Sequence, residues 1–224
     1  MFAKSANIEL RYDVVAQGIG QLMDYLGGDP SIASHTRAGL WTFSSAINNP
    51  VPMTSNLGIV KRSFPAPEIS QGYSNTLTQF DLYVDQLISI IGRGGDGSSA
   101  NSAKKLLILS TDGVSDIDPL EPFYMNLIGQ FNMSFCETLK SKNVEVAIVY
   151  TPYLPLPQSD YYNATLARPG NFSASRATDV PIVFKKCAGD LMVTANDAAS
   201  LRSGFQTVYT QSLQSQETPV RLSQ

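Results

Sequence analysis

One stretch, Lys104–Gly113 (KKLLILSTDG), constrains the fold more than any other part of the sequence. Four large apolar residues, Leu106 to Leu109, run without a break into the polar residues that follow. A continuous apolar run of this length is typical of a strand buried on both faces, as in a parallel sheet. Open α/β sheets place their ligand sites at the carboxyl ends of such strands, which makes Asp112 a candidate binding residue. The same Asp112-Gly113 pair also suits a simple tight turn.

The segments after this stretch predict a βαβ unit. Pro122–Lys142 carries apolar residues at helical spacing, and Val144–Tyr150 (VEVAIVY) has the composition of a second parallel strand. A short last strand is predicted at Leu191–Val193. A parallel sheet with crossover helices on its faces is therefore expected, and Lys104–Gly113 is predicted to be one of its strands.

The first part of the chain predicts two helices and two strands. Apolar residues step by four and three from Ile8 to Leu26, which is one face of an amphipathic helix, and Leu77–Ile91 repeats the pattern. Arg37–Ser45 and Met53–Ser63 are each predicted as strands. Two adjacent strands of this kind can form an antiparallel edge on a mostly parallel sheet.

The second part of the chain is dominated by a long proline-rich connection, Thr151–Thr178. A connection of this length is usually functional or an insertion in a compact domain, and residues 1–224 are predicted to form one domain. Its tyrosines Tyr153, Tyr161 and Tyr162 are expected to cover the core, with a partner surface as the alternative. A short helix is predicted at Asp179–Ala188, followed by a final amphipathic helix.

Composition excludes several classes of function. The net charge of −3 gives no electrostatic footprint for nucleic acid. No run of 18 apolar residues occurs, so no membrane span is predicted within these residues. The only histidine, His35, lies in a predicted surface loop, which leaves little for histidine-dependent catalysis. Cys136 and Cys187 are either buried thiols or one disulfide, and they do not suggest a zinc site.

Two motifs resemble the von Willebrand factor A (vWA) domain. The predicted strand that ends in Thr111-Asp112-Gly113 is similar to the TDG element of that family, and Tyr73–Thr76 (YSNT) is similar to its TNT metal loop. The C-terminal part narrows the resemblance to the TadG-like proteins of bacterial tight-adherence (Flp) pilus systems. The features that carry this narrower match are Cys136 before Leu139-Lys140, Cys187-Ala188 before a short strand, and Leu201–Phe205 followed by Val220-Arg221-Leu222.

The vWA resemblance implies a doubly wound, mostly parallel sheet with helices on both faces and a metal-ion-dependent adhesion site. In such a sheet Lys104–Gly113 is expected to be the central strand. Such a site binds a divalent cation such as Mg²⁺ through oxygen ligands. By this resemblance, Asp112 corresponds to the carboxylate ligand in the third metal loop of the family. Ser74 corresponds to the hydroxyl ligand in the second metal loop, and Thr76 is the alternative to Ser74. The DxSxS ligand motif of the family does not occur in this sequence. Because Met1-Phe2 stands where that motif would end, the first strand and three ligands are expected to precede Met1, which leaves the site incomplete.

The resemblance also implies a function without chemistry. TadG-like proteins suggest an extracytoplasmic module, periplasmic or on the cell surface, that helps to assemble or anchor a pilus through protein partners. In that family a membrane helix precedes the domain, so a membrane anchor is expected only in a longer parent chain. The resemblance further implies that Cys136 and Cys187 form a disulfide.

Two alternatives remain open at the level of sequence. An extracellular eukaryotic vWA adhesion module would use the N-x-[ST] sequons at Asn132, Asn163 and Asn171 as glycan acceptors. A haloacid-dehalogenase-like phosphatase would use Asp116 and Asp118 as nucleophile and acid/base. The second alternative fits less well, because its paired aspartates should directly follow the strand.

Overall fold

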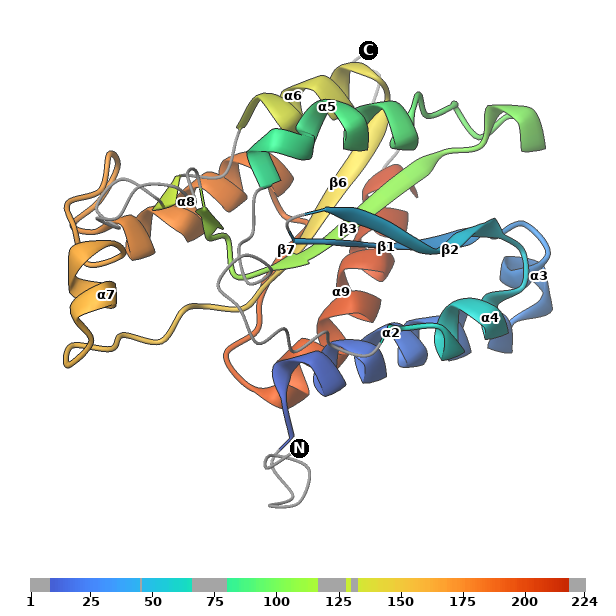
Figure 1. Ribbon diagram of the computed structural model, residues 1–224. Coiled ribbons are helices and arrows are strands. Elements are labelled where there is room, and N and C mark those ends of the chain that lie inside the picture. The colour runs from blue at the N-terminus through green and yellow to red at the C-terminus, as the bar shows by residue number, and fades with distance from the viewer. Residues whose placement is uncertain (1–8, 45, 66–79, 117–127, 130–132, 218–224) are drawn as a thin grey trace, which may run out of the picture.

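The computed structural model describes residues 9–44, 46–65, 80–116, 128–129 and 133–217 (Figure 1). The first half of this described chain contains α2 (Arg11–Gly28), α3 (Pro30–Ala33), β1 (Ala38–Phe43), β2 (Ile47–Thr54), α4 (Leu57–Arg62), α5 (Phe80–Ile91) and a short 3₁₀ helix, η2 (Ala100–Ser102). The second half contains β3 (Lys105–Thr111), β4 (Ser115–Asp116), β5 (Ile128–Gly129), α6 (Met133–Ser141), β6 (Val144–Tyr150), α7 (Asp160–Ala164), α8 (Arg176–Ala188), β7 (Met192–Thr194) and α9 (Ala198–Glu217).

A parallel sheet in the strand order β3-β6-β7 forms the centre of the fold. The β3–β6 register runs without a break from Lys105 opposite Val144 to Thr111 opposite Tyr150. β7 pairs in parallel with the other edge of β6, at the carboxyl end of that strand. The predicted βαβ unit is thus confirmed: β3 and β6 are parallel neighbours, and α6 lies between them in sequence.

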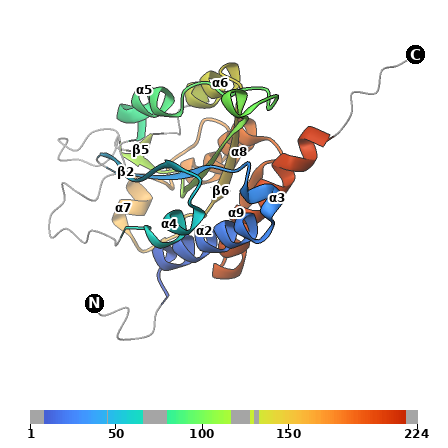
Figure 2. The same ribbon diagram turned by 90° about the vertical axis from the view of Figure 1, so that its right-hand side faces the viewer.

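Helices cover both faces of this sheet, as Figures 1 and 2 show. α9 packs across β3, β6 and β7, and α2 lies on α9 and on α4. On the opposite face α6 and α8 pack on β6, and α5 packs on α6. This is the doubly wound α/β arrangement that the sequence predicts. None of the described helices is both long and apolar enough to cross a membrane.

β6, not β3, is the central and most buried strand among the described residues. Every residue of β6 except Glu145 is buried, whereas in β3 only Leu109 is. The apolar composition of β3 correctly predicts a strand of a parallel sheet. Composition does not determine how many neighbours the strand has, and the structure describes a strand partner on one side of β3 only.

The predicted strand at Met53–Ser63 is wrong. β1 pairs antiparallel with β2, which begins at Ile47 and ends at Thr54, and the chain then turns into the helix α4. The side chain of Asn56 caps this helix by accepting a hydrogen bond from the amide of Ile59, at 3.2 Å. Leu57 and Val60 are both buried, because a spacing of three residues places them on one helix face.

The helix predicted at Pro122–Lys142 is shorter than expected. Its described helical part is α6, and Ile128-Gly129 instead forms β5, which pairs antiparallel with β4. Glycine is a poor helix former, which is consistent with a break in the helical pattern at Gly129. Residues 122–127 and 130–132 lie outside the described part of the chain.

The long connection Thr151–Thr178 contains α7 and leads into α8, which begins at Arg176, three residues earlier than predicted. Tyr162 and Leu166 are buried there and form a small apolar cluster against which Tyr153 packs. Tyr153 and Tyr162 thus pack inside the connection, in a cluster separate from the main core. Tyr161 lies in α7.

A buried carboxylate holds the end of this connection. Asp179 is fully buried in the first turn of α8 and accepts hydrogen bonds from the amide of Phe172, at 3.1 Å, and from the hydroxyl of Ser173, at 2.6 Å. Gly170 passes so close that a Cβ there would lie 2.5 Å from the Asp179 carboxylate oxygens. Burial alone would raise the pKa of Asp179, but these hydrogen bonds outweigh it and lower that pKa.

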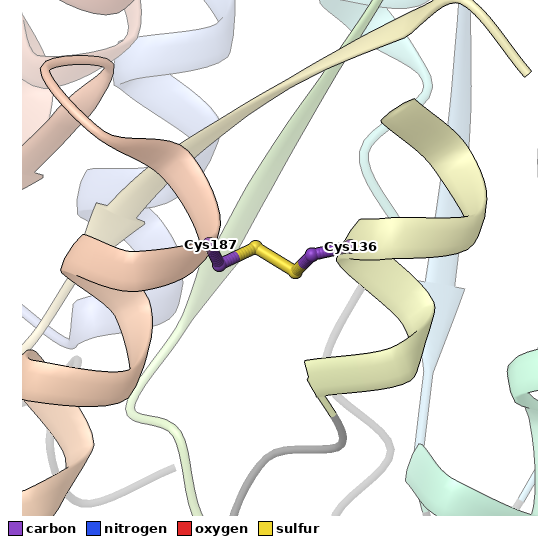
Figure 3. The surroundings of a disulfide bond; sticks show 2 residues. All are labelled: Cys136 and Cys187. Atoms are coloured by element: carbon purple, nitrogen blue, oxygen red, sulfur yellow. A yellow bond between two sulfur atoms is a disulfide. The ribbon is translucent and has the colours of Figure 1, made fainter. Parts of the chain in front are cut away.

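A disulfide between Cys136 and Cys187 joins α6 to α8 (Figure 3). The two cysteines are 51 residues apart in sequence, their Cα atoms are 5.5 Å apart, and both are buried. The bond therefore ties together two helices that cover the same face of the sheet. The expected pairing is confirmed.

We expect the double variant Cys136→Ala/Cys187→Ala to lose roughly 4 kcal/mol of unfolding free energy at most, because the closed loop no longer restricts the unfolded chain. Urea unfolding of the variant and of the parent protein measures this loss. Parent protein with its disulfide reduced serves as the control and should approach the variant's midpoint. Two free thiols in non-reduced peptides from protein made in an oxidising compartment would contradict the bond.

Candidate metal and binding site at the carboxyl end of the sheet

The candidate site begins where β3 ends, at a turn formed by Thr111, Asp112, Gly113 and Val114. Asp112 Oδ1 accepts a hydrogen bond from the amide of Val114 at 3.2 Å. The hydroxyl of Thr111 accepts one from the amide of Gly113 at 3.0 Å. Each side chain thus bonds to the backbone two residues further on, as Asx and ST turns do. The motif can therefore be a tight turn and part of a binding site at the same time, because the hydrogen bond to Val114 uses Oδ1 of Asp112 and not Oδ2.

Gly113 is required at this turn for two reasons. Its φ of +77° lies in the left-handed region, which side chains other than glycine rarely adopt. A Cβ at this position would also lie 2.3 Å from Val180 and 2.9 Å from the ring of Phe184, both on α8. The TDG element is therefore pressed directly against α8, and its shape depends on that helix.

Asp112 is half-buried, and burial raises the pKa of its carboxyl group. Two features oppose that shift: the hydrogen bond from the Val114 amide, and the positive charge of Arg11. The pKa of Asp112 is raised overall, because burial destabilises the ionised carboxylate by more than these two interactions stabilise it.

Arg11 is part of this site and was not singled out from the sequence. It is the first residue of α2, and its Nη2 donates a hydrogen bond to the carbonyl oxygen of Pro152, 3.0 Å away, just beyond β6. Tyr150, at the end of β6, has its pKa raised to about 12 by burial and by the charge of Asp112, while Arg11 opposes this shift. The signal that could have pointed to Arg11 is its place at the start of α2. A helix that begins at the carboxyl edge of a parallel sheet places its first turn at that edge.

The other predicted site residues are only partly described. Ser74 and Thr76 lie outside the described residues, and so does Asp118. Asp116 lies in β4, four residues beyond Asp112, where it pairs with Ile128 of β5, and not directly after β3. The structure therefore does not place Asp116 where a phosphatase nucleophile is expected.

The described residues alone do not form a metal site. No group of three or more histidine, cysteine, aspartate or glutamate side chains that could hold an ion occurs among them. They supply one carboxylate, Asp112, whereas a hard divalent cation takes six or more oxygen ligands. The positive charge of Arg11 nearby opposes a second cation at the same place.

No protein-family model and no curated protein matches this sequence. Several solved structures resemble it. One is the proximal thread matrix protein 1 of the mussel byssus with a zinc-occupied MIDAS motif (TM-score 0.53, 14% identity, 88% of this chain and 42% of that chain). Another is the pilus adhesin SpaC of Lactobacillus rhamnosus GG (TM-score 0.60, 13% identity, 89% and 28%). A third is the conserved hypothetical protein BatB of Bacteroides thetaiotaomicron (TM-score 0.55, 13% identity, 91% and 88%).

The chain has a vWA-like fold. At these identities the likeness establishes the fold alone. The chain spans less than half of the mussel protein and less than a third of the adhesin. Within the vWA-like frame, Asp112 lies at the carboxyl end of a parallel strand, where open α/β folds bind their ligands.

Substitution of Asp112 by asparagine should stabilise the cation-free protein at neutral pH. Because the folded state raises the pKa of Asp112, the folded protein loses stability as pH rises from the ordinary value of 3.8 through the raised value, and the loss persists above it. The asparagine side chain could still accept the Val114 hydrogen bond without carrying a charge. Thermal unfolding in EDTA at pH 7 and at pH 3 measures the difference.

The Asp112→Asn variant should unfold at a higher temperature than the parent protein at pH 7. This difference in stability should shrink at pH 3, where both side chains are neutral. The matched control is Asp85→Asn, at an exposed aspartate of α5, which should change little at either pH. A variant less stable than the parent at pH 7 would show that the Asp112 charge stabilises the fold.

Proposed function

We propose that this chain is a non-enzymatic, protein-binding module of the TadG type that takes part in the assembly or anchoring of a Flp pilus. The observation that carries the proposal is the vWA-like fold together with the C-terminal motifs that resemble TadG-like proteins. The similar structures include a pilus adhesin and a thread matrix protein of the mussel byssus, and neither is named as an enzyme. These neighbours support an adhesion-type role, and the pilus assignment rests on the sequence motifs.

We further propose that the module works outside the cytoplasm, in the periplasm or on the cell surface. The buried Cys136–Cys187 bond supports this location, because disulfides form and persist in oxidising compartments. The mussel byssus protein and the pilus adhesin support it as well.

We propose Asp112 as one ligand of a divalent-cation site of the Mg²⁺ type. Ser74 would supply a second oxygen, with Thr76 as its substitute, and the remaining ligands would come from outside the described residues. The mussel protein whose structure carries zinc in a MIDAS motif supports a divalent cation in this fold. When bound, such a cation would offer an open coordination position to an acidic group of a protein partner.

Cation binding should depend on Asp112. In calorimetric titrations with Mg²⁺ and with Mn²⁺, we expect at most weak binding to this chain, because it contains one carboxylate and two hydroxyl candidates for the site. The Asp112→Ala variant should abolish the signal, and Asp85→Ala should leave it unchanged. Equal heats for parent and Asp112→Ala proteins would remove Asp112 from the proposed ligands.

The pilus role can be tested in the host cell. The gene that encodes the longest polypeptide containing this chain is deleted, and Flp pilin on the cell surface is quantified with and without complementation. We expect surface pilin to fall on deletion and to return with the parent gene and with Asp85→Ala, because that aspartate is exposed and is not one of the proposed ligands. Unchanged surface pilin after deletion would refute the pilus role while leaving the vWA-like fold intact.

A further inference from the structure

Arg11 reaches the candidate site from α2 and is held there by the backbone. It is the first residue of that helix, and its Nη2 atom donates a hydrogen bond to the carbonyl oxygen of Pro152, 3.0 Å away. The residue before Pro152, Thr151, donates through its amide to the carbonyl oxygen of Thr111 at 3.1 Å. Asp112 directly follows Thr111. Two hydrogen bonds therefore bring the guanidinium group of Arg11 to the edge of the sheet that carries Asp112.

Arg11 and Asp112 act on each other through their charges and do not form a direct ion pair. The ion pairs among the described residues are Lys61–Asp24, Lys185–Asp190 and Arg202–Glu9. The positive charge of Arg11 nevertheless opposes the rise in pKa of both Asp112 and Tyr150. A charge acts over such a gap because the half-buried site excludes part of the water that screens charges elsewhere.

This arrangement serves the ionised carboxylate of a cation-free site. Burial disfavours the charge of Asp112, and Arg11 is the charged group among the described residues that counteracts this effect. A divalent cation at Asp112 would also counteract it, with twice the charge. Arg11 is tied to Pro152, so its positive charge stays beside an arriving cation and repels it. One counter-charge thus hinders the arrival of the other.

Arg37 offers a comparison within the same chain. It is also an exposed arginine that donates to a backbone carbonyl, that of Met53, at 3.2 Å. The charge of Arg37 is not among the causes that shift the pKa of Asp112. A bond from an arginine to a carbonyl is therefore not what distinguishes Arg11. What distinguishes it is its place at the carboxyl edge beside Asp112.

We propose that Arg11 is the resident counter-charge of Asp112 and competes with a divalent cation for that carboxylate. This inference rests on the cation site proposed above and adds its regulation. At low cation concentration Arg11 balances the charge of Asp112, and no coordination position is offered to an acidic group of a partner. Arg11 raises the cation concentration at which the site fills, so partner binding begins only above that concentration.

A double-mutant cycle in EDTA tests the counter-charge without any cation. Urea unfolding at pH 7 compares the parent chain with Arg11→Gln, Asp112→Asn and the double variant. Arg11→Gln should raise the unfolding equilibrium constant about threefold more in the parent background than in the Asp112→Asn background, because only the parent has a charge for Arg11 to balance. The lost bond to Pro152 is common to both backgrounds and cancels.

A titration with Mn²⁺, followed by electron paramagnetic resonance, tests the competition. Arg11→Gln should bind Mn²⁺ about tenfold more tightly than the parent chain, because it removes a unit charge that repels the cation. Arg11→Lys keeps that charge and should bind like the parent chain. The matched control Arg37→Gln removes an exposed arginine with the same kind of bond to a carbonyl, and it should also bind like the parent chain.

The two experiments separate failure of this inference from failure of the cation site. Additive effects in the cycle would overturn the counter-charge role of Arg11. Equal Mn²⁺ affinity of the parent chain and Arg11→Gln, or weaker binding by Arg11→Gln, would overturn the competition and leave the proposed cation site intact. An absence of Mn²⁺ binding to the parent chain and to all variants would refute the cation site itself and the competition with it. The cycle in EDTA would still decide the counter-charge.

Discussion

The parallel pairing of β3 with β6 is the interaction on which the rest of this structure depends. Seven consecutive residue pairs hold the two strands in one register, so their carboxyl ends finish side by side. Asp112 follows one strand and Pro152 the other, and Arg11 at the start of α2 bonds to the second of these ends. A shift of one residue in this register would turn the side chains of one strand to the opposite face and separate the elements of the site.

The position of α8 decides the shape of that site, and two buried contacts fix α8. The Cys136–Cys187 bond ties it to α6, and Phe184 packs edge-on against Tyr150 with ring centroids 5.4 Å apart. Phe184 also leaves no room for a Cβ at Gly113. The covalent bond and the aromatic packing thus act on the same helix. This gives the loops at the carboxyl edge a rigid support, as binding loops on α/β scaffolds require.

The described part of the site contains one carboxylate, Asp112, in a place where burial disfavours its charge. Asp112 is removed from water far enough that its pKa rises despite Arg11 and the Val114 amide. A folded protein tolerates such a group where a partner compensates it or where function needs it. The proposed cation would compensate the Asp112 charge.

The sequence by itself determined the fold class, because the apolar runs of β3 and β6 and the helical periods of α2, α5 and α9 are local patterns. It indicated Asp112 as a candidate binding residue and, through the family resemblance, predicted the Cys136–Cys187 disulfide that the structure contains. It mistook α4 for a strand, since a six-residue helix with few buried residues leaves little periodic signal. Only the tertiary structure decided that β6 is the central strand among the described residues and that the charge of Arg11 acts on Asp112. Those facts depend on contacts between residues far apart in the chain, and local propensity carries no information about them.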